Sequence, residues 1–232
     1  MFLAPAREAS AQMLSWTDRV FVNVSVGQQW MNQSLRTVGE FEIYEEFAKW
    51  DAPFDIDDSM LFDIGGGYRV WKNLALGAGF TRTTDTHDLT LTASIPDTLE
   101  FDRPHIETRS VTGLTREEKA FHLSATWMVP ITDRLDIALS GGPSFFTVTQ
   151  AYVNGMTVAA GTSALGDVTT ASLEKSATGF HIAGDATVRI MRNFGVGFMA
   201  RFSRAKIDTP ELQGGSIEAG GFQGLVGARI RF

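Results

Sequence analysis

The C-terminal stretch Ser216–Phe232 places the tightest limit on what this chain can fold into. From residue 222 onward, every second position is apolar, and the intervening positions are mostly polar and include Arg229 and Arg231. Side chains of a strand point alternately to opposite faces, so the stretch predicts a strand with one apolar face and one charged face. The apolar face meets either a protein core or lipid. The apolar set consists of Phe222, Gly224, Val226, Ala228, Ile230 and Phe232.

Composition excludes several classes of protein. The chain has 232 residues, of which 44% are hydrophobic, and no run approaches the roughly 18 apolar residues of a membrane helix. Composition does not exclude a membrane β-barrel, because the strands of such a barrel are only half apolar. The net charge of −7 argues against a nucleic-acid partner. The chain contains no cysteine, which weakly favours an exported protein without disulfides.

The first residues resemble the end of a signal peptide. Met1–Ala6 is short and apolar, and Ala9-Ser10-Ala11 has the small-x-small form of a cleavage site, but no basic segment precedes it. We therefore expect residues 1–17 to be a signal-peptide remnant or an N-terminal periplasmic segment. Residues 18–232 are expected to form one domain.

Three short polar connections each join two alternating stretches. They are Trp71-Lys72-Asn73-Leu74, Ile131-Thr132-Asp133-Arg134 and Met191-Arg192-Asn193-Phe194. Asn and Asp in tight connections favour β-hairpins. With a first strand at Arg19–Trp30 and the last at Ser216–Phe232, the sequence predicts eight strands.

Long segments separate these hairpins: about 28 residues before Met60, then Asp85–Glu118 and Thr149–Ser176. They exceed ordinary loop lengths, and short turns at one end with long loops at the other are typical of outer-membrane barrels. Glu40–Trp50 and His87–Ile95 also have strand character. If both crossed a membrane the barrel would have ten strands, but we expect strand extensions or loop hairpins beyond the membrane.

The polar face of the expected strands holds glycine, serine, threonine and charges of both signs, with almost no lysine. Small residues and mutually paired charges suit the narrow interior of an eight-stranded barrel. A gated ion path would use the same charges, but a structural network is favoured. The charged and titratable residues expected in the lumen are Asp63, Arg69, Glu118, His122, Asp136, His181, Asp185, Arg189, Arg201, Arg229 and Arg231.

The C-terminal Gly-Leu-Val-Gly-Ala-Arg-Ile-Arg-Phe (224–232) and the hairpin Gly65–Phe80 resemble small bacterial outer-membrane β-barrels of the OmpA-like and OmpW-like superfamily. Residues 129–137 and 192–197 repeat the hairpin pattern. The resemblance implies an all-β, eight-stranded antiparallel up-and-down transmembrane barrel with short periplasmic turns and long extracellular loops. It implies an integral outer-membrane location, and contact with outer-membrane lipid, lipopolysaccharide and the barrel-assembly machinery. That machinery would read an insertion signal formed by Phe222, Val226, Ile230 and Phe232.

Two groups of residues suggest catalysis. His122 and Ser124 lie two residues apart on one strand face, which resembles the His-x-Ser pair of outer-membrane lipid A deacylases, although here the pair faces the lumen. Asp85-Thr86-His87-Asp88, with His105, resembles the Asp and His sites of outer-membrane proteases. Four histidines without cysteine give no convincing metal-ligand spacing, and we expect neither a metal nor another cofactor.

The sequence therefore favours a non-enzymatic outer-membrane barrel that binds through its loops or forms a narrow conduit for small or hydrophobic molecules. Leu89–Pro96 and Phe101–Pro104 would form a rim for a small hydrophobic molecule or an extracellular ligand. The alternatives are a barrel hydrolase acting on lipid A or surface peptides, and a soluble ligand-binding β-barrel.

Overall fold

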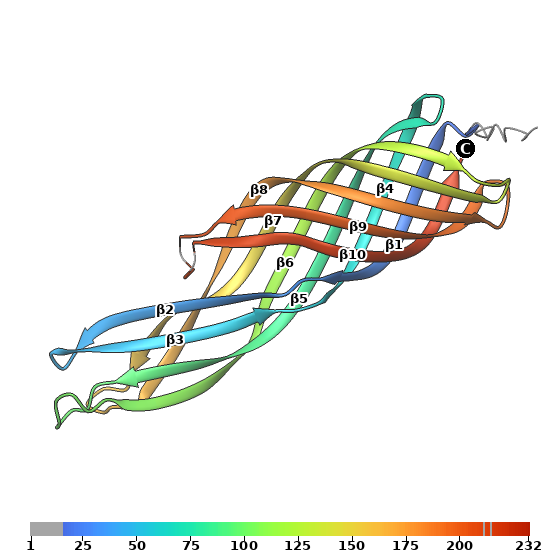
Figure 1. The fold of residues 1–232 in the computed structure, drawn as a ribbon. Coiled ribbons are helices and arrows are strands. Elements are labelled where there is room, and N and C mark those ends of the chain that lie inside the picture. Colours follow the sequence, from blue (N-terminus) through green and yellow to red (C-terminus); the bar gives the residue numbers. More distant parts are fainter. Residues whose placement is uncertain (1–15, 211, 214) are drawn as a thin grey trace, which may run out of the picture.

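The computed structural model describes residues 16–210, 212–213 and 215–232, so the expected signal-peptide remnant lies almost wholly outside the described residues. Within that part of the chain the fold is all-β (Figure 1). No described helix is long and apolar enough to cross a membrane. The described strands are β1 (Val20–Trp30), β2 (Gln33–Ile43), β3 (Glu46–Ile56), β4 (Ser59–Trp71), β5 (Leu74–Ile95), β6 (His105–Pro130), β7 (Leu135–Val158), β8 (Leu165–Arg189), β9 (Phe194–Asp208) and β10 (Ser216–Arg231).

The antiparallel sheet closes into a ring. Its order is β2-β3-β5-β4-β1-β10-β9-β8-β7-β6, and pairing of β5 with β6 closes the wall. The first and last ring strands meet, because β1 pairs with β10 from Phe21 opposite Arg231 to Trp30 opposite Phe222. The β2–β3 hairpin lies outside the ring. Its strand β3 pairs with the far part of β5, and Arg36 of β2 forms a single bridge with Gln213.

The three short connections lie together at one end of the ring, as the sequence predicts. They join β4 to β5, β6 to β7 and β8 to β9. Both ends of the described barrel wall lie there too, since the amide of Arg19 donates to the carbonyl of Phe232 at 2.6 Å. All other strand connections are at the opposite end.

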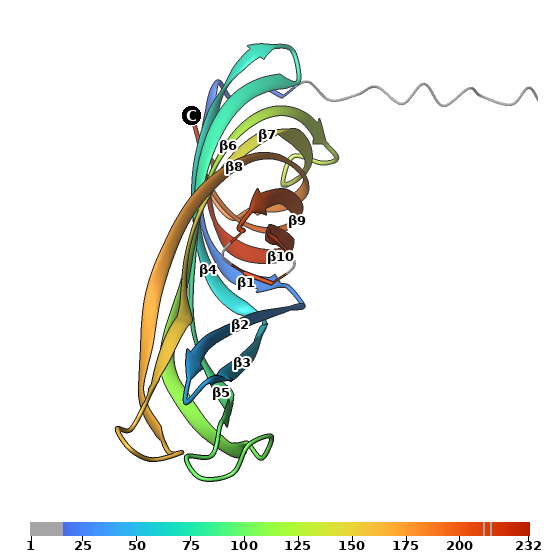
Figure 2. The same cartoon turned by 90° about the vertical axis from the view of Figure 1, so that its left-hand side faces the viewer.

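The prediction of long loops at that opposite end is wrong. Strand β5 continues to Ile95 and β6 begins at His105, so most of 85–118 is paired strand. Strand β7 likewise runs to Val158, and β8 begins at Leu165. Glu40–Trp50 spans the turn of the β2–β3 hairpin, and His87–Ile95 is the far part of β5. These strand portions project from the ring as an extension, formed by β2, β3 and the far parts of β5 to β8 (Figures 1 and 2).

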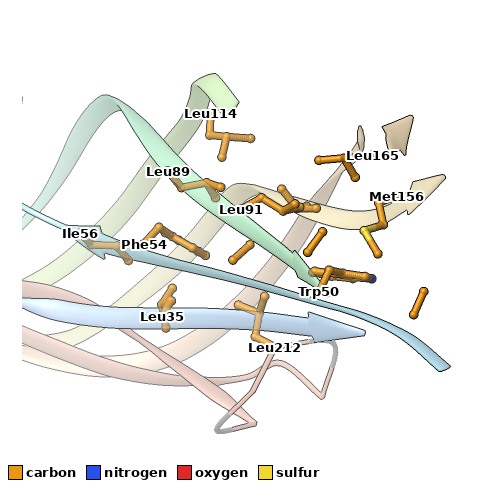
Figure 3. Close-up of a cluster of buried hydrophobic side chains, with 14 of the residues drawn as sticks. Leu35, Trp50, Phe54, Ile56, Leu89, Leu91, Leu114, Met156, Leu165 and Leu212 are labelled. Atoms are coloured by element: carbon orange, nitrogen blue, oxygen red, sulfur yellow. The ribbon is translucent and has the colours of Figure 1, made fainter. Parts of the chain in front are cut away.

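The extension has its own hydrophobic core (Figure 3). Leu89, Leu91, Ala93 and Ile95 alternate on the inner face of β5 and are buried there, so the apolar side chains of Leu89–Pro96 belong to this core. They pack between the β2–β3 hairpin and the wall formed by β6, β7 and β8. Apolar burial is the physical reason why these segments stay paired instead of becoming loops. Other members of this core are Leu35, Trp50, Phe54, Ile56, Leu114, Val153, Met156, Leu165, Leu212 and Ile217.

The ring itself has the opposite polarity, because most of its large apolar side chains are exposed and only a few, such as Phe21, Met199 and Leu225, are buried inside. On β4 the exposed set runs from Met60 to Val70, ten residues apart. At about 3.3 Å per residue and a strand tilt of 35–45°, these residues span about 25 Å along the barrel axis, the height of the apolar band of an outer-membrane barrel. We call this band the apolar belt. Aromatic residues mark its two edges: Trp30, Phe80, Phe121, Phe145, Phe180 and Phe222 near the extension, and Tyr68, Trp71, Trp127, Phe194 and Phe232 near the short turns.

Candidate functional site in the barrel interior and the extension

The ring interior begins, at the short-turn end, with a carboxylate shared by two arginines. Asp136 is buried and accepts a hydrogen bond from Arg189 Nε at 3.0 Å and another from Arg231. Arg189 also lies 3.6 Å from Asp18. Arg69, expected to meet an acid, instead donates to the carbonyl oxygen of Trp16 and lies over its ring at 5.9 Å.

A second ion pair lies further inside. Arg229 donates from Nε to Asp185 at 2.9 Å and from Nη1 to the Ser25 hydroxyl at 2.8 Å. Glycine at position 197 makes room for this arginine, because a Cβ there would lie 2.7 Å from Arg229 Nε. The tight space explains why the polar face of the strands is so rich in small residues.

A hydrogen-bonded chain of side chains runs across the next layer. Arg201 donates to Asp63 at 2.7 Å and to the Thr81 hydroxyl at 2.8 Å. Thr81 lies 3.1 Å from His122 Nε2, and His122 Nδ1 lies 2.8 Å from the hydroxyl of Ser144. The chain continues through His181 to end at another serine: Ser144 Oγ lies 2.9 Å from His181 Nδ1, and His181 Nε2 lies 3.0 Å from Ser124 Oγ.

An ion pair closes the interior below the extension. Arg116 lies 3.4 Å from Glu118, and both side chains are buried. Glu118 also accepts the backbone amide of Gly220 at 2.9 Å. Gly220 has a φ of +90°, a conformation that L side chains rarely adopt, so a glycine here lets the β10 backbone turn its amide toward the carboxylate. The apolar core of the extension begins on the far side of this pair.

The structure thus pairs most of the charges that the sequence assigns to the lumen. Arg229 meets Asp185, Arg231 and Arg189 meet Asp136, and Arg201 meets Asp63. Sequence reasoning missed Arg116 as the partner of Glu118, although their i, i+2 spacing on one strand was the available signal. Ser25, Thr81 and Gln223 lie on the polar strand face that the sequence predicts, whereas sequence reasoning missed Gln29, Ser144 and Gln150.

Little free space remains between these layers. A cavity of about 70 Å³ lies between these layers and is lined by residues such as Asn23, His122 and Met199. Such a volume holds a few waters at most. Buried ion pairs thus occupy the interior in successive layers, and the core of the extension begins beyond the outermost pair.

The proposed deacylase pair is not assembled. His122 bonds to Ser144 and Thr81, whereas Ser124 bonds to His181. Ser144 does lie beside an imidazole, as a nucleophile needs, but its side chain is fully buried in the filled interior. No acyl chain can reach it there.

The Asp85–Asp88 segment lines an acidic slot in the wall of the extension. Strands β3 and β5 pair only where Lys49–Asp51 faces Thr92–Ser94. If the pairing continued in the same register, Pro53 would lie opposite Thr90 and Asp55 opposite Asp88. Pro53 lacks an amide hydrogen to donate, and like charges directly opposite each other are unfavourable. The strands separate instead and leave a cavity of about 530 Å³, lined by side chains that include Asp55, Asp57, Asp85, His87 and Asp88.

His87 forms one wall of this slot. Its ring stacks on Phe54, with 5.1 Å between centroids and 7° between planes. Burial lowers the pKa of His87 below its ordinary value, and the nearby Asp85 carboxylate opposes that effect. His105 is remote, because it pairs with Ile95 whereas His87 pairs with Leu114, roughly 30 Å away along the strands. The protease-like grouping of these two histidines is therefore wrong. Among the described residues, no three or more His, Asp or Glu side chains are placed so that they could hold a metal ion together.

No protein-family model matches the sequence, and no curated protein matches it. Several solved structures share its fold. The attachment invasion locus protein Ail of Yersinia pestis, solved with the heparin analogue sucrose octasulfate, is 12% identical with a TM-score of 0.44 over 92% of this chain and 99% of its own. Neisserial surface protein A is 12% identical with a TM-score of 0.47, covering 92% and 97%. The outer-membrane protease OmpT of Escherichia coli is 9% identical with a TM-score of 0.46, covering 96% and 99%.

These neighbours are bacterial outer-membrane β-barrel proteins. The all-β antiparallel ring that the sequence predicts is confirmed by the sheet topology of this chain itself. They include an attachment protein, a surface protein and a protease, so the shared fold does not select one activity. The activity must be argued from this chain's own residues.

Proposed function

We propose that the chain is an integral outer-membrane barrel with a closed lumen, which acts by presenting its extension outside the cell. The inversion of polarity in the ring carries this proposal. Leu76, Leu139 and Phe198 are more than half exposed on the outside, while Asp136, Arg229 and Arg231 are buried inside. A soluble barrel would bury the first group and expose the second.

The belt supports eight crossings, and the short turns support one orientation. All eight ring strands carry exposed apolar residues of the belt, so eight strands cross the membrane and the β2–β3 hairpin lies outside it. The short turns lie on the periplasmic side, which leaves the extension extracellular. Phe222 and Val226 on β10 and Phe232 directly after it are exposed in the belt, where the barrel-assembly machinery would contact them together with Ile230 during insertion.

Binding through the extension is better supported than conduction. Ion pairs fill the lumen in successive layers, and the apolar core of the extension covers its outer end. The extension adds about 13 residues to β5 beyond Arg82, which is roughly 40 Å of paired strand. A rigid platform of this length suits recognition of a ligand at the cell surface, such as the small hydrophobic molecule or extracellular ligand expected from the sequence.

Fractionation and bilayer recording test both parts of the proposal. We expect the protein to require detergent for extraction, to shift in a gel on heating, and to insert into planar bilayers without stepwise conductance. Recovery in the soluble fraction would overturn the membrane placement. A steady conductance from folded, inserted protein would overturn the closed lumen and favour the conduit.

A further inference from the structure

A cationic pair lies directly above the belt on the outer faces of β5 and β6. Arg82 and Lys119 are opposite each other across the two strands, and their side chains are 56% and 44% exposed. One step nearer the membrane, Phe80 and Phe121 are opposite each other and exposed. Two cations therefore lie next to two aromatic residues, one step further from the membrane, at the level where the apolar belt ends.

Like charges directly opposite each other on neighbouring strands are unfavourable unless an anion lies between them. Glu117 supplies one such anion, at 2.5 Å from Arg82 and 2.6 Å from Lys119. Its hydrogen bond with Lys119 lowers the pKa of the Glu117 carboxyl, so this group stays ionised at neutral pH. One carboxylate against two cations leaves a net charge of +1, in a chain whose net charge is −7.

The opposite side of the barrel provides a comparison at the same height. Arg204 is the next outward residue above Phe202 on β9, as Arg82 is above Phe80 on β5. Arg204 pairs with Glu218 on β10, and the two further outward charges on β9, Lys206 and Asp208, cancel each other. This side carries no net charge. The β5–β6 side therefore carries an excess of positive charge next to exposed aromatic rings, which the β9–β10 side lacks.

We propose that Arg82 and Lys119 bind a phosphate group of an outer-leaflet glycolipid of the lipid A class, with Phe80 and Phe121 in contact with its apolar part. The inference rests on the proposed membrane placement, which sets this pair at the headgroup level of the outer leaflet. Charge complementarity and continuity with the belt select a phosphorylated lipid over a soluble anion. A free anion would gain nothing from the two aromatic rings.

The test measures binding of lipid A to the folded protein in detergent micelles by native mass spectrometry, with dephosphorylated lipid A and inorganic phosphate as comparison ligands. We expect bisphosphorylated lipid A to bind most tightly. Each neutralised cation should weaken binding about fivefold, so R82Q/K119Q should lose about 25-fold. R204Q, the matched control, should change binding less than twofold.

Glu117→Gln gives a result of the opposite sign. Removing the carboxylate frees both cations for the lipid phosphate, so E117Q should strengthen binding about fivefold. Loss of folding in any variant would show in the heat-modifiable gel shift, which keeps the binding result separate from stability.

Equal binding of phosphorylated and dephosphorylated lipid A would overturn the site, as would equal losses in R82Q/K119Q and R204Q. Tight binding of inorganic phosphate alone would overturn the assignment to a lipid. Failure of the membrane placement itself would show earlier, in the fractionation.

Discussion

At the residue scale, the hydrogen-bonded chain through the two lumen histidines has one consistent direction. Thr81 gives its single hydroxyl hydrogen to Asp63 at 2.7 Å, so its oxygen accepts from His122 Nε2. Because Arg201 already balances the charge of Asp63, we take both imidazoles as neutral, with one N–H each. His122 Nδ1 then accepts from Ser144, whose oxygen accepts from His181 Nδ1.

This direction predicts opposite tautomers for the two histidines. We expect His122 to carry its hydrogen on Nε2 and His181 to carry it on Nδ1, which nitrogen-15 NMR of histidine-labelled protein in micelles distinguishes. Thr81→Val removes the group that sets the direction, so the chain can reverse and His122 should show both tautomers. Ser124→Ala, at the other end, should leave both tautomers unchanged. A common tautomer for both histidines in the unmodified protein would contradict the assignment.

At the element scale, the ring and the extension differ in what holds them together. The ring strands pair into a closed wall and expose their apolar side chains, so their stability depends on the surrounding lipid. The extension is held by its own buried core, in which Leu91 and Ile95 are fully buried. Trp50 of β3 packs there on Gly39 of β2, where a Cβ would lie 2.4 Å from the indole nitrogen.

Leu91→Ala tests this separation. Deleting a fully buried leucine side chain typically costs 2–5 kcal/mol, and here the cost should fall on the extension alone. Hydrogen exchange should accelerate in β2, β3 and the far part of β5, while the amides of β4 and β10 keep their protection. Thr90→Ala, the adjacent exposed position, should change neither. Equal acceleration in the ring would show that the two parts unfold together.

A strand can be predicted from the sequence when its two faces have clearly different surroundings. The ring strands alternate strictly between lipid and a narrow polar interior, so their positions and short turns follow from the residue pattern. Long polar segments were expected as loops because of their composition, whereas Glu40–Trp50 and His87–Ile95 were expected as strand extensions or loop hairpins because of their alternation. The full length of the paired strands and the acidic slot depend on contacts between distant strands, which no local pattern encodes.

At the scale of the whole molecule, the lumen network and the belt together decide what the barrel can do. Breaking one buried ion pair leaves an unpaired charge in a space with almost no water, which typically costs 3–5 kcal/mol. The pairs therefore hold the ring closed as well as filling it. A conduit would require several layers to rearrange together, whereas binding at the extension requires no change inside the ring.

The most general prediction compares two equally exposed apolar residues in different surroundings. Leu139 is 58% exposed near the middle of the belt, and Phe47 is 57% exposed on the extension. An arginine facing lipid at the bilayer midplane costs about 2–4 kcal/mol, whereas one facing water costs almost nothing. Reversible unfolding in lipid vesicles should therefore show Leu139→Arg destabilised by that amount and Phe47→Arg within about 0.5 kcal/mol of the unmodified protein. Equal small effects at both positions would mean that the belt faces water, and the chain would then be the soluble ligand-binding barrel.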